Sequence, residues 1–158
     1  MTVLSFFTWC ENSWLGEAIR ASLWLFPAIE SFHLLALAVL GGTMLIVNLR
    51  LMGFVLERQP VAQLWRDVRP WMMGSLTVML VSGVLLFTSE AIKLYYHEAF
   101  WVKMASLLMS IVFTFTVLRR SALADPSPAR PWRNRAVALV SLVLWSAVGM
   151  GGRWIGFS

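Results

Sequence analysis

Glu30 and His33 are the residues whose type and position most clearly suggest chemistry. They stand near one end of an apolar stretch, 28–47, which is long enough to cross a bilayer as a helix. A carboxylate and an imidazole inside a membrane helix are unfavourable, so they indicate either a functional site or a structural ion pair. A neutral imidazole is also a good ligand for haem iron or copper.

Three further polar residues are expected near the same side of the membrane. Counting from the ends of the apolar stretches, Lys103 lies about 5 Å inside the third stretch. Arg153 lies near the end of the last stretch, and His97 lies just before the third. We expect Lys103 to share a level with Glu30. An ion pair of Glu30 with Lys103 or Arg153, with His33 hydrogen-bonded beside it, is the structural alternative to a cofactor site.

The composition indicates a membrane protein. Of 158 residues, 59% are hydrophobic and only 13% are charged, whereas soluble domains carry about 25% charged residues. We expect one domain over 1–158, an all-α integral membrane four-helix bundle, with Pro70 as the first residue of its second span. Each span has close to the ~20 residues needed. The predicted spans cover about 25–48, 70–88, 100–118 and 136–155.

The segment 1–21 mixes apolar and polar residues and is expected to lie at the membrane interface. Asn12 or Ser13 is placed to cap a helix that starts near Trp14. A simple lead-in to the first span is the alternative. The first ten residues lack a basic region and a small-residue cleavage site, so we expect no removable signal peptide.

The basic residues predict the orientation in the membrane. They gather between the first and second spans and between the third and fourth, which places both of these loops in the cytoplasm and both termini outside. This placement also explains most of the net charge of +5, so we expect no nucleic-acid partner. The loop residues are Arg50, Arg58, Arg66, Arg69, Arg119, Arg120, Arg130, Arg133 and Arg135.

A b-type haem protein for electron transfer or a redox step is the leading functional hypothesis. A haem fits between the helices of a bundle and needs one or two axial ligands. His33 is the predicted axial ligand, with His97 or Lys103 as the second. Glu30 and Arg153 are expected to support the site from nearby.

Two other functions remain open. A copper-binding or copper-transfer protein would use the same outer pocket, with His33, His97 and Met104 as ligands. A subunit or scaffold without a cofactor would use the polar residues only to fix helix packing. A di-metal site is disfavoured because it needs a second Glu-x-x-His pair, and the chain has two histidines in all.

The chain resembles an uncharacterised family of four-span bacterial membrane proteins over nearly its full length. That family carries no known activity, and the resemblance implies a multi-pass protein of the bacterial cytoplasmic (inner) membrane. The residues that carry it are Glu30-Ser-Phe-His33, Leu49-Arg50-Leu51-Met52-Gly53, Phe100-Trp-Val-Lys103 and Gly151-Gly152-Arg153.

The layout is more distantly similar to two better-understood groups. The four-span haem-binding protoporphyrinogen oxidase has a histidine in its first helix and a W-x-x-K-like stretch opening its third, which His33 and Lys103 match. The membrane domain of copper-resistance proteins shares these two features, and Glu30 departs from the oxidase pattern. The resemblances imply haem b, or copper, as the cofactor. Besides the bilayer, the candidate partners are a periplasmic redox or metal-carrier protein and a second copy of the chain; enzyme activity is left open.

Reporter fusions test the predicted orientation. A reporter fused after Ser121 should lie in the cytoplasm and one fused after Ser158 outside, because arginine-rich loops remain on the cytoplasmic side. Paired alkaline phosphatase and fluorescent-protein fusions measure this. The reverse pattern would contradict the orientation and move the polar residues to the cytoplasmic half of the membrane.

Overall fold

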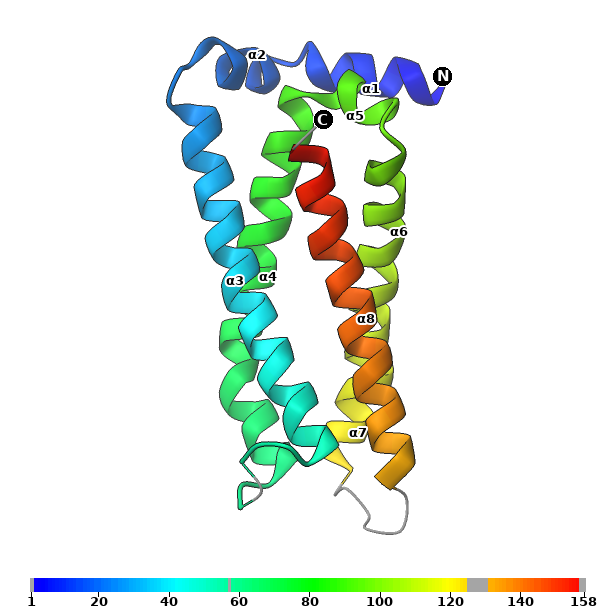
Figure 1. The fold of residues 1–158 in the computed structure, drawn as a ribbon. Coiled ribbons are helices and arrows are strands. Elements are labelled where there is room, and N and C mark those ends of the chain that lie inside the picture. The colour runs from blue at the N-terminus through cyan, green and yellow to red at the C-terminus, as the bar shows by residue number, and fades with distance from the viewer. Residues whose placement is uncertain (1, 57, 125–130, 157–158) are drawn as a thin grey trace.

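The computed structural model describes residues 2–56, 58–124 and 131–156, and it contains helices and no strand in this part of the chain (Figure 1). Four long helices run side by side: α3 (Leu25–Met52), α4 (Val61–Ser89), α6 (Glu98–Phe113) and α8 (Pro131–Gly156). By length and composition α3, α4 and α8, and α6 with its continuation to Leu123, can each cross a membrane. The predicted all-α four-helix membrane bundle is therefore confirmed.

A short π-helix, η1 (Thr114–Leu118), and α7 (Arg119–Leu123) continue α6 without a break. Trp145 of α8 donates its indole N–H to the Thr114 hydroxyl across 3.1 Å. This hydrogen bond joins the wider turn of the π-helix to α8. Single π turns of this kind interrupt an α-helix only locally.

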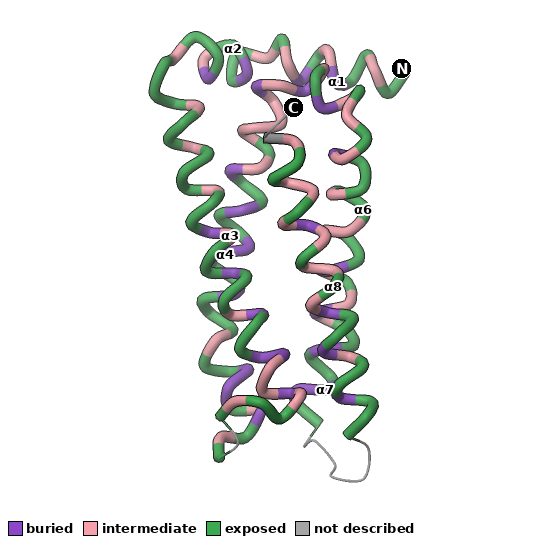
Figure 2. The backbone as a smooth tube through the Cα atoms, viewed as in Figure 1, coloured by how far each residue is buried: buried purple, intermediate pink, exposed green. Residues whose placement is uncertain are grey.

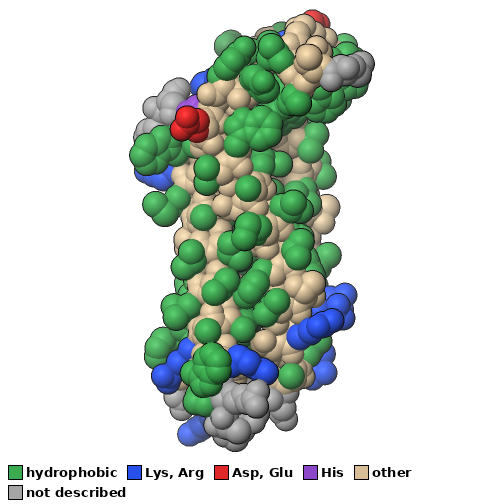
Figure 3. Space-filling view, turned by 90° about the vertical axis from the view of Figure 1, so that its right-hand side faces the viewer, with side chains coloured by type: hydrophobic (Ala, Val, Ile, Leu, Met, Phe, Trp, Pro, Cys, Tyr) green, Lys and Arg blue, Asp and Glu red, His purple; other side chains and the backbone are tan. Residues whose placement is uncertain are grey.

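Both termini lie at one end of the bundle, beside α1 (Val3–Glu11), α2 (Trp14–Ala21) and α5 (Ala91–Tyr95). We call this the terminal end. Lys and Arg side chains gather at the opposite end, which we call the arginine end, and hydrophobic side chains cover the shaft between them (Figure 3). That the terminal end faces outside remains a prediction. The exposed basic residues of the arginine end are Arg58, Arg66, Arg69, Arg119, Arg120, Arg133 and Arg135.

The second long helix begins at Val61, not at Pro70 as predicted, and Pro70 lies inside it. Leu64 and Trp65 are buried in the core, which gives this early part of α4 a packed face. The charged residue Arg66, which argued against a helix inside the membrane, is exposed. The helix thus extends beyond the apolar span because its charges project outward.

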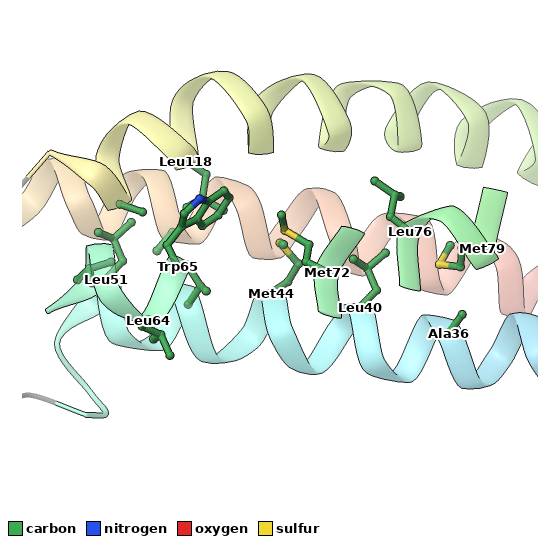
Figure 4. Close-up of a cluster of buried hydrophobic side chains, with 14 residues drawn as sticks. Ala36, Leu40, Met44, Leu51, Leu64, Trp65, Met72, Leu76, Met79 and Leu118 are labelled. Carbon is green, nitrogen blue, oxygen red and sulfur yellow. The ribbon is translucent and has the colours of Figure 1, made fainter. Parts of the chain in front are cut away.

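The main core fills the arginine half of the bundle, between α3, α4, α7 and α8. Figure 4 shows its larger side chains interlocked between α3 and α4, and Figure 2 shows buried residues on the facing sides of the helices. In a bilayer, close packing stabilises helix pairs, because lipid is as apolar as the side chains. The buried members are Ala36, Leu40, Met44, Val47, Leu51, Val61, Leu64, Trp65, Met72, Leu76, Met79, Leu118, Ala122 and Ala138.

The two helices of the N-terminal segment lie across the terminal end. Ser13 caps α2, as the sequence predicted for Asn12 or Ser13, by accepting the N–H of Gly16 across 3.3 Å. Trp9 and Trp14 are exposed, as suits a segment at the membrane interface.

An arginine clamp holds this segment on the bundle. Arg20 donates to the carbonyl of Ser89 at the end of α4, across 3.0 Å, and to the carbonyl of Glu11 across 2.7 Å. The Glu11 carboxylate lies 3.9 Å from the Arg20 guanidinium and accepts the N–H of Ile92 at the start of α5. The clamp therefore joins α1 and α2 to the ends of α4 and α5.

Gly16 tests this docking. A Cβ at Gly16 would meet the Thr88 carbonyl oxygen at 2.5 Å and that of Glu11 at 2.6 Å. Gly16→Ala should therefore displace α2 and destabilise the protein by about 1–3 kcal/mol, as overpacking does. Thermal unfolding in detergent measures this.

Gly41→Ala is the control, because a Cβ at Gly41 has open space and alanine favours the helix. Equal melting temperatures for the two variants would contradict the docked position of α2.

Candidate functional site

Six residues from the four long helices form two contact groups at similar depth, which together we call the polar layer. α3 contributes His33, α4 contributes Ser82 and Gly83, and α6 contributes Lys103. From α8 come Gly151 and Gly152, which lie against Lys103. By the rise of an α-helix these residues lie ~6–12 Å inside the terminal end of their helices, so four segments far apart in sequence form a single level.

A hydrogen bond of 2.8 Å joins His33 Nδ1 to Ser82 Oγ. The Ser82 hydroxyl lies 2.6 Å from the Val78 carbonyl and 3.3 Å from the Met79 carbonyl. Because carbonyls only accept, the hydroxyl hydrogen points to them, and the Ser82 oxygen accepts from His33 Nδ1–H. The neutral ring then carries its free electron pair on Nε2, which has no hydrogen-bond partner among the described residues. Such an imidazole is oriented and ready to bind a metal through Nε2.

The absence of a side chain at Gly83 lets the imidazole approach α4 closely. A Cβ at this position would lie 3.4 Å from His33 Cε1. The Met79 carbonyl lies beside the same ring. His33 is therefore held against the backbone of α4 on one edge and is half-exposed on the other.

Lys103 extends along a part of α8 that has no side chains, at Gly151 and Gly152, as His33 does against Gly83. Its Cβ lies 3.1 Å from a Cβ placed on Gly151, and its Nζ 3.3 Å from one placed on Gly152. Within the described part of the chain, no carboxylate lies within 4 Å of the ammonium, and no carbonyl accepts a hydrogen bond from it. A half-buried cation without a partner is unfavourable inside a membrane.

The Lys103 ammonium is close enough to act electrostatically on the His33 imidazole. The sequence predicted that Lys103 lies at the level of Glu30, about one turn nearer the terminal end than His33. Because α6 begins at Glu98, two residues before the predicted span, Lys103 and Glu30 lie equally far from the starts of their helices, and their shared level stays a prediction. The two residues that carry the distant family resemblances therefore lie within electrostatic reach of each other.

The polar layer separates the main core from a second apolar cluster at the terminal end. We call this second group the aromatic cluster: Phe7, Phe87 and Phe100. The rings of Phe87 and Phe100 stack with centroids 5.9 Å apart, and Phe7 packs edge-on against both. The aromatic cluster therefore covers the polar layer from the terminal end.

Glu30 is exposed and points away from the polar layer. No described basic group lies within 4 Å of its carboxylate, so the predicted ion pair with Lys103 is not formed. Residues three apart on a helix differ by about 60° in direction. With His33 turned toward α4, Glu30 is directed outward.

His97 is not brought together with His33. It precedes α6, and its Nδ1 is buried without a partner in the described part of the structure. His97 lies six residues before Lys103, so it stands about 9 Å nearer the terminal end than the Lys103 backbone does. Arg153 directly follows Gly152 at the edge of the layer and is exposed.

The described residues contain no group of three or more His, Cys, Asp or Glu side chains placed to hold a metal ion. Burial raises the pKa of the Cys10 thiol, next to Phe7 at the terminal end, which disfavours the thiolate that binds metals. Any metal held at the polar layer therefore needs most of its ligands from a cofactor.

Sequence reasoning missed Ser82. The available signal was a hydroxyl beside a glycine in the middle of an apolar span, but its partner depends on how α3 and α4 pack. Serines inside membrane helices are common because they bond their own helix carbonyls. Ser82 also bonds carbonyls of its own helix, so its sequence position does not reveal the second hydrogen bond, with His33.

The fold and the polar layer define a class: a multi-pass membrane bundle with a lysine and a histidine enclosed at one level. The chain belongs to a family of unknown function, DUF6644, whose sequence pattern matches residues 6–158. No curated protein matches the chain, and no solved structure does.

Ser82→Ala tests the orientation of His33. Removing the hydroxyl leaves Nδ1–H without its acceptor, so the preference for this tautomer should fall and stability should drop by about 1 kcal/mol. Nitrogen-15 NMR of histidine-labelled protein reports the tautomer.

The control is Ser75→Ala, because the Ser75 hydroxyl bonds only carbonyls of its own helix, those of Trp71 and Met72. An unchanged His33 spectrum in Ser82→Ala would contradict the hydrogen bond.

Proposed function

We propose that this protein binds a b-type haem at the polar layer and serves electron transfer or a redox step. The observation that carries the proposal is the His33–Ser82 hydrogen bond, which leaves Nε2 free to bind iron. Orienting partners of this kind are typical of histidines that ligate metals. A bound haem supplies one-electron chemistry, tuned by its axial ligand and surroundings.

The surroundings of His33 also suit a haem. The layer lies between two apolar clusters, which suits the mostly apolar ring system of a haem. The positive charge of Lys103 complements a haem, which carries two propionate groups.

Ser82 replaces Glu30 in this proposal as the group that orients the axial histidine, because Glu30 points outward. The second axial ligand predicted at His97 receives no support, since His97 stands about 9 Å nearer the terminal end than Lys103 does. A bound haem would take His33 as an axial ligand, and Lys103 would be the candidate for the second.

Copper receives less support than haem. It was expected to use His33, His97 and Met104, but the histidines lie at different levels and Met104 is 44% exposed. A single histidine is too few protein ligands for a copper site, whereas haem needs only one axial ligand.

The absorption spectrum of protein purified from haem-producing cells tests the proposal. Wild-type protein should show haem bands with stoichiometric iron, and His33→Ala should lose them while still inserting. Ser82→Ala should bind haem about 10-fold more weakly, as loss of an orienting partner does.

His97→Ala is the control and should leave the spectrum unchanged. Colourless wild-type protein with bound copper would support the copper alternative, and protein without haem or copper would support a cofactor-free scaffold. Either result would contradict haem binding.

A further inference from the structure

Neighbouring helices of the bundle are not all packed against each other. We call the boundary between two neighbouring helices a seam. α3 packs along α4, α6 packs along α8, and α3 packs against α8. α4 and α6, both described over their whole length, approach each other at too few points to form a packed seam.

The exposure of α4 residues shows where this seam is open. Phe87, Leu80 and Leu76 share one face of the helix, being seven and eleven residues apart. Phe87 is covered by Phe100 of α6, and Leu76 is only 6% exposed in the main core. Leu80, between them, is 43% exposed, so this face is uncovered at the level next to the polar layer.

A ligand in the polar layer is therefore accessible from the bilayer. The aromatic cluster closes the terminal end and the main core closes the other, while the seam between α4 and α6 opens sideways. Lipid-soluble ligands enter proteins by such routes, because their apolar bodies never need to cross water.

The unpaired ammonium of Lys103 indicates what part of the ligand it meets. A cation half-buried in a membrane requires an anionic partner, and the described residues supply none. A carboxylate of the ligand would complete the pair with a charge-assisted hydrogen bond.

We infer that haem reaches the polar layer sideways from the bilayer, through the seam between α4 and α6, and that Lys103 binds a haem propionate. This inference rests on the proposed haem binding by His33. It assigns Lys103 as an anchor for the carboxylate and not as a ligand of the iron.

Lys103 could bind a propionate or the iron, and binding of two compounds distinguishes these roles. One is haem and the other is haem dimethyl ester, which lacks the propionate charges. Wild-type protein should bind haem about 10-fold more tightly than the ester, the effect of one charge-assisted hydrogen bond. Lys103→Met should lose this preference, and Lys103→Arg should keep it. The control, Lys93→Met, removes an exposed lysine that pairs with Glu90 and should behave as wild type.

The contrary results are equally specific. Lys103→Met that still prefers haem over the ester would overturn the propionate assignment, as would a change of iron spin state in that variant. Failure of wild-type protein to bind either compound would overturn the proposed function itself and this inference with it. Because Lys103→Met removes an unpaired charge, the variant should fold.

The route is tested by the rate of haem uptake from vesicles. Leu80→Trp fills the seam and should slow uptake several-fold at unchanged final occupancy. Val143→Trp, at an exposed position on α8, is the matched control. Equal rates for the two variants would overturn access through this seam.

Discussion

Polar groups within the membrane-spanning helices must find partners inside the protein, since hydrocarbon offers no hydrogen bonds. The hydroxyls meet this requirement by bonding carbonyls of their own helices, as Ser75 does with Trp71 and Ser110 with Ser106. Ser82 does the same and still has an oxygen lone pair for His33. Lys103 is left with neither a carbonyl nor a carboxylate in the described part of the chain. This unmet charge accompanies an oriented imidazole in the polar layer, and the proposed haem would supply its anionic partner.

The two halves of the bundle are held together by different interactions. The arginine half contains the main core, where large side chains from α3 and α4 interlock. The terminal half is held by the aromatic cluster and by the Arg20 clamp, with the polar layer between these and the main core. The arginine half thus contains the larger packed core, while the terminal half leaves its α4–α6 seam open. Sites that admit a ligand are expected in the less densely packed part of a protein.

The four long helices were predictable because long apolar runs are a local property of sequence. The Ser13 cap was predictable for the same reason. The start of α4 was misplaced because the exposed charges around Pro70 hid the buried face of Leu64 and Trp65. The direction of Glu30 could not be predicted: α3 is apolar on nearly all sides, so no stripe marks its inward face. The partnership of His33 and Ser82 depends on the register of α3 against α4, which is set by packing along the whole core. Counting along the chain placed Lys103 in the terminal half of the bundle, and its position five residues after Glu98 agrees with that depth.

The central claim is that His33 Nε2, and no other protein nitrogen, holds the iron of a haem in the polar layer. Pulsed electron paramagnetic resonance of the haem-loaded protein tests it most directly. Protein labelled with nitrogen-15 in histidine should show coupling of the iron to one histidine nitrogen, and the coupling should vanish in His33→Gln. Protein labelled in lysine should show none. Coupling to two histidines, to a lysine nitrogen, or to no protein nitrogen would contradict the account.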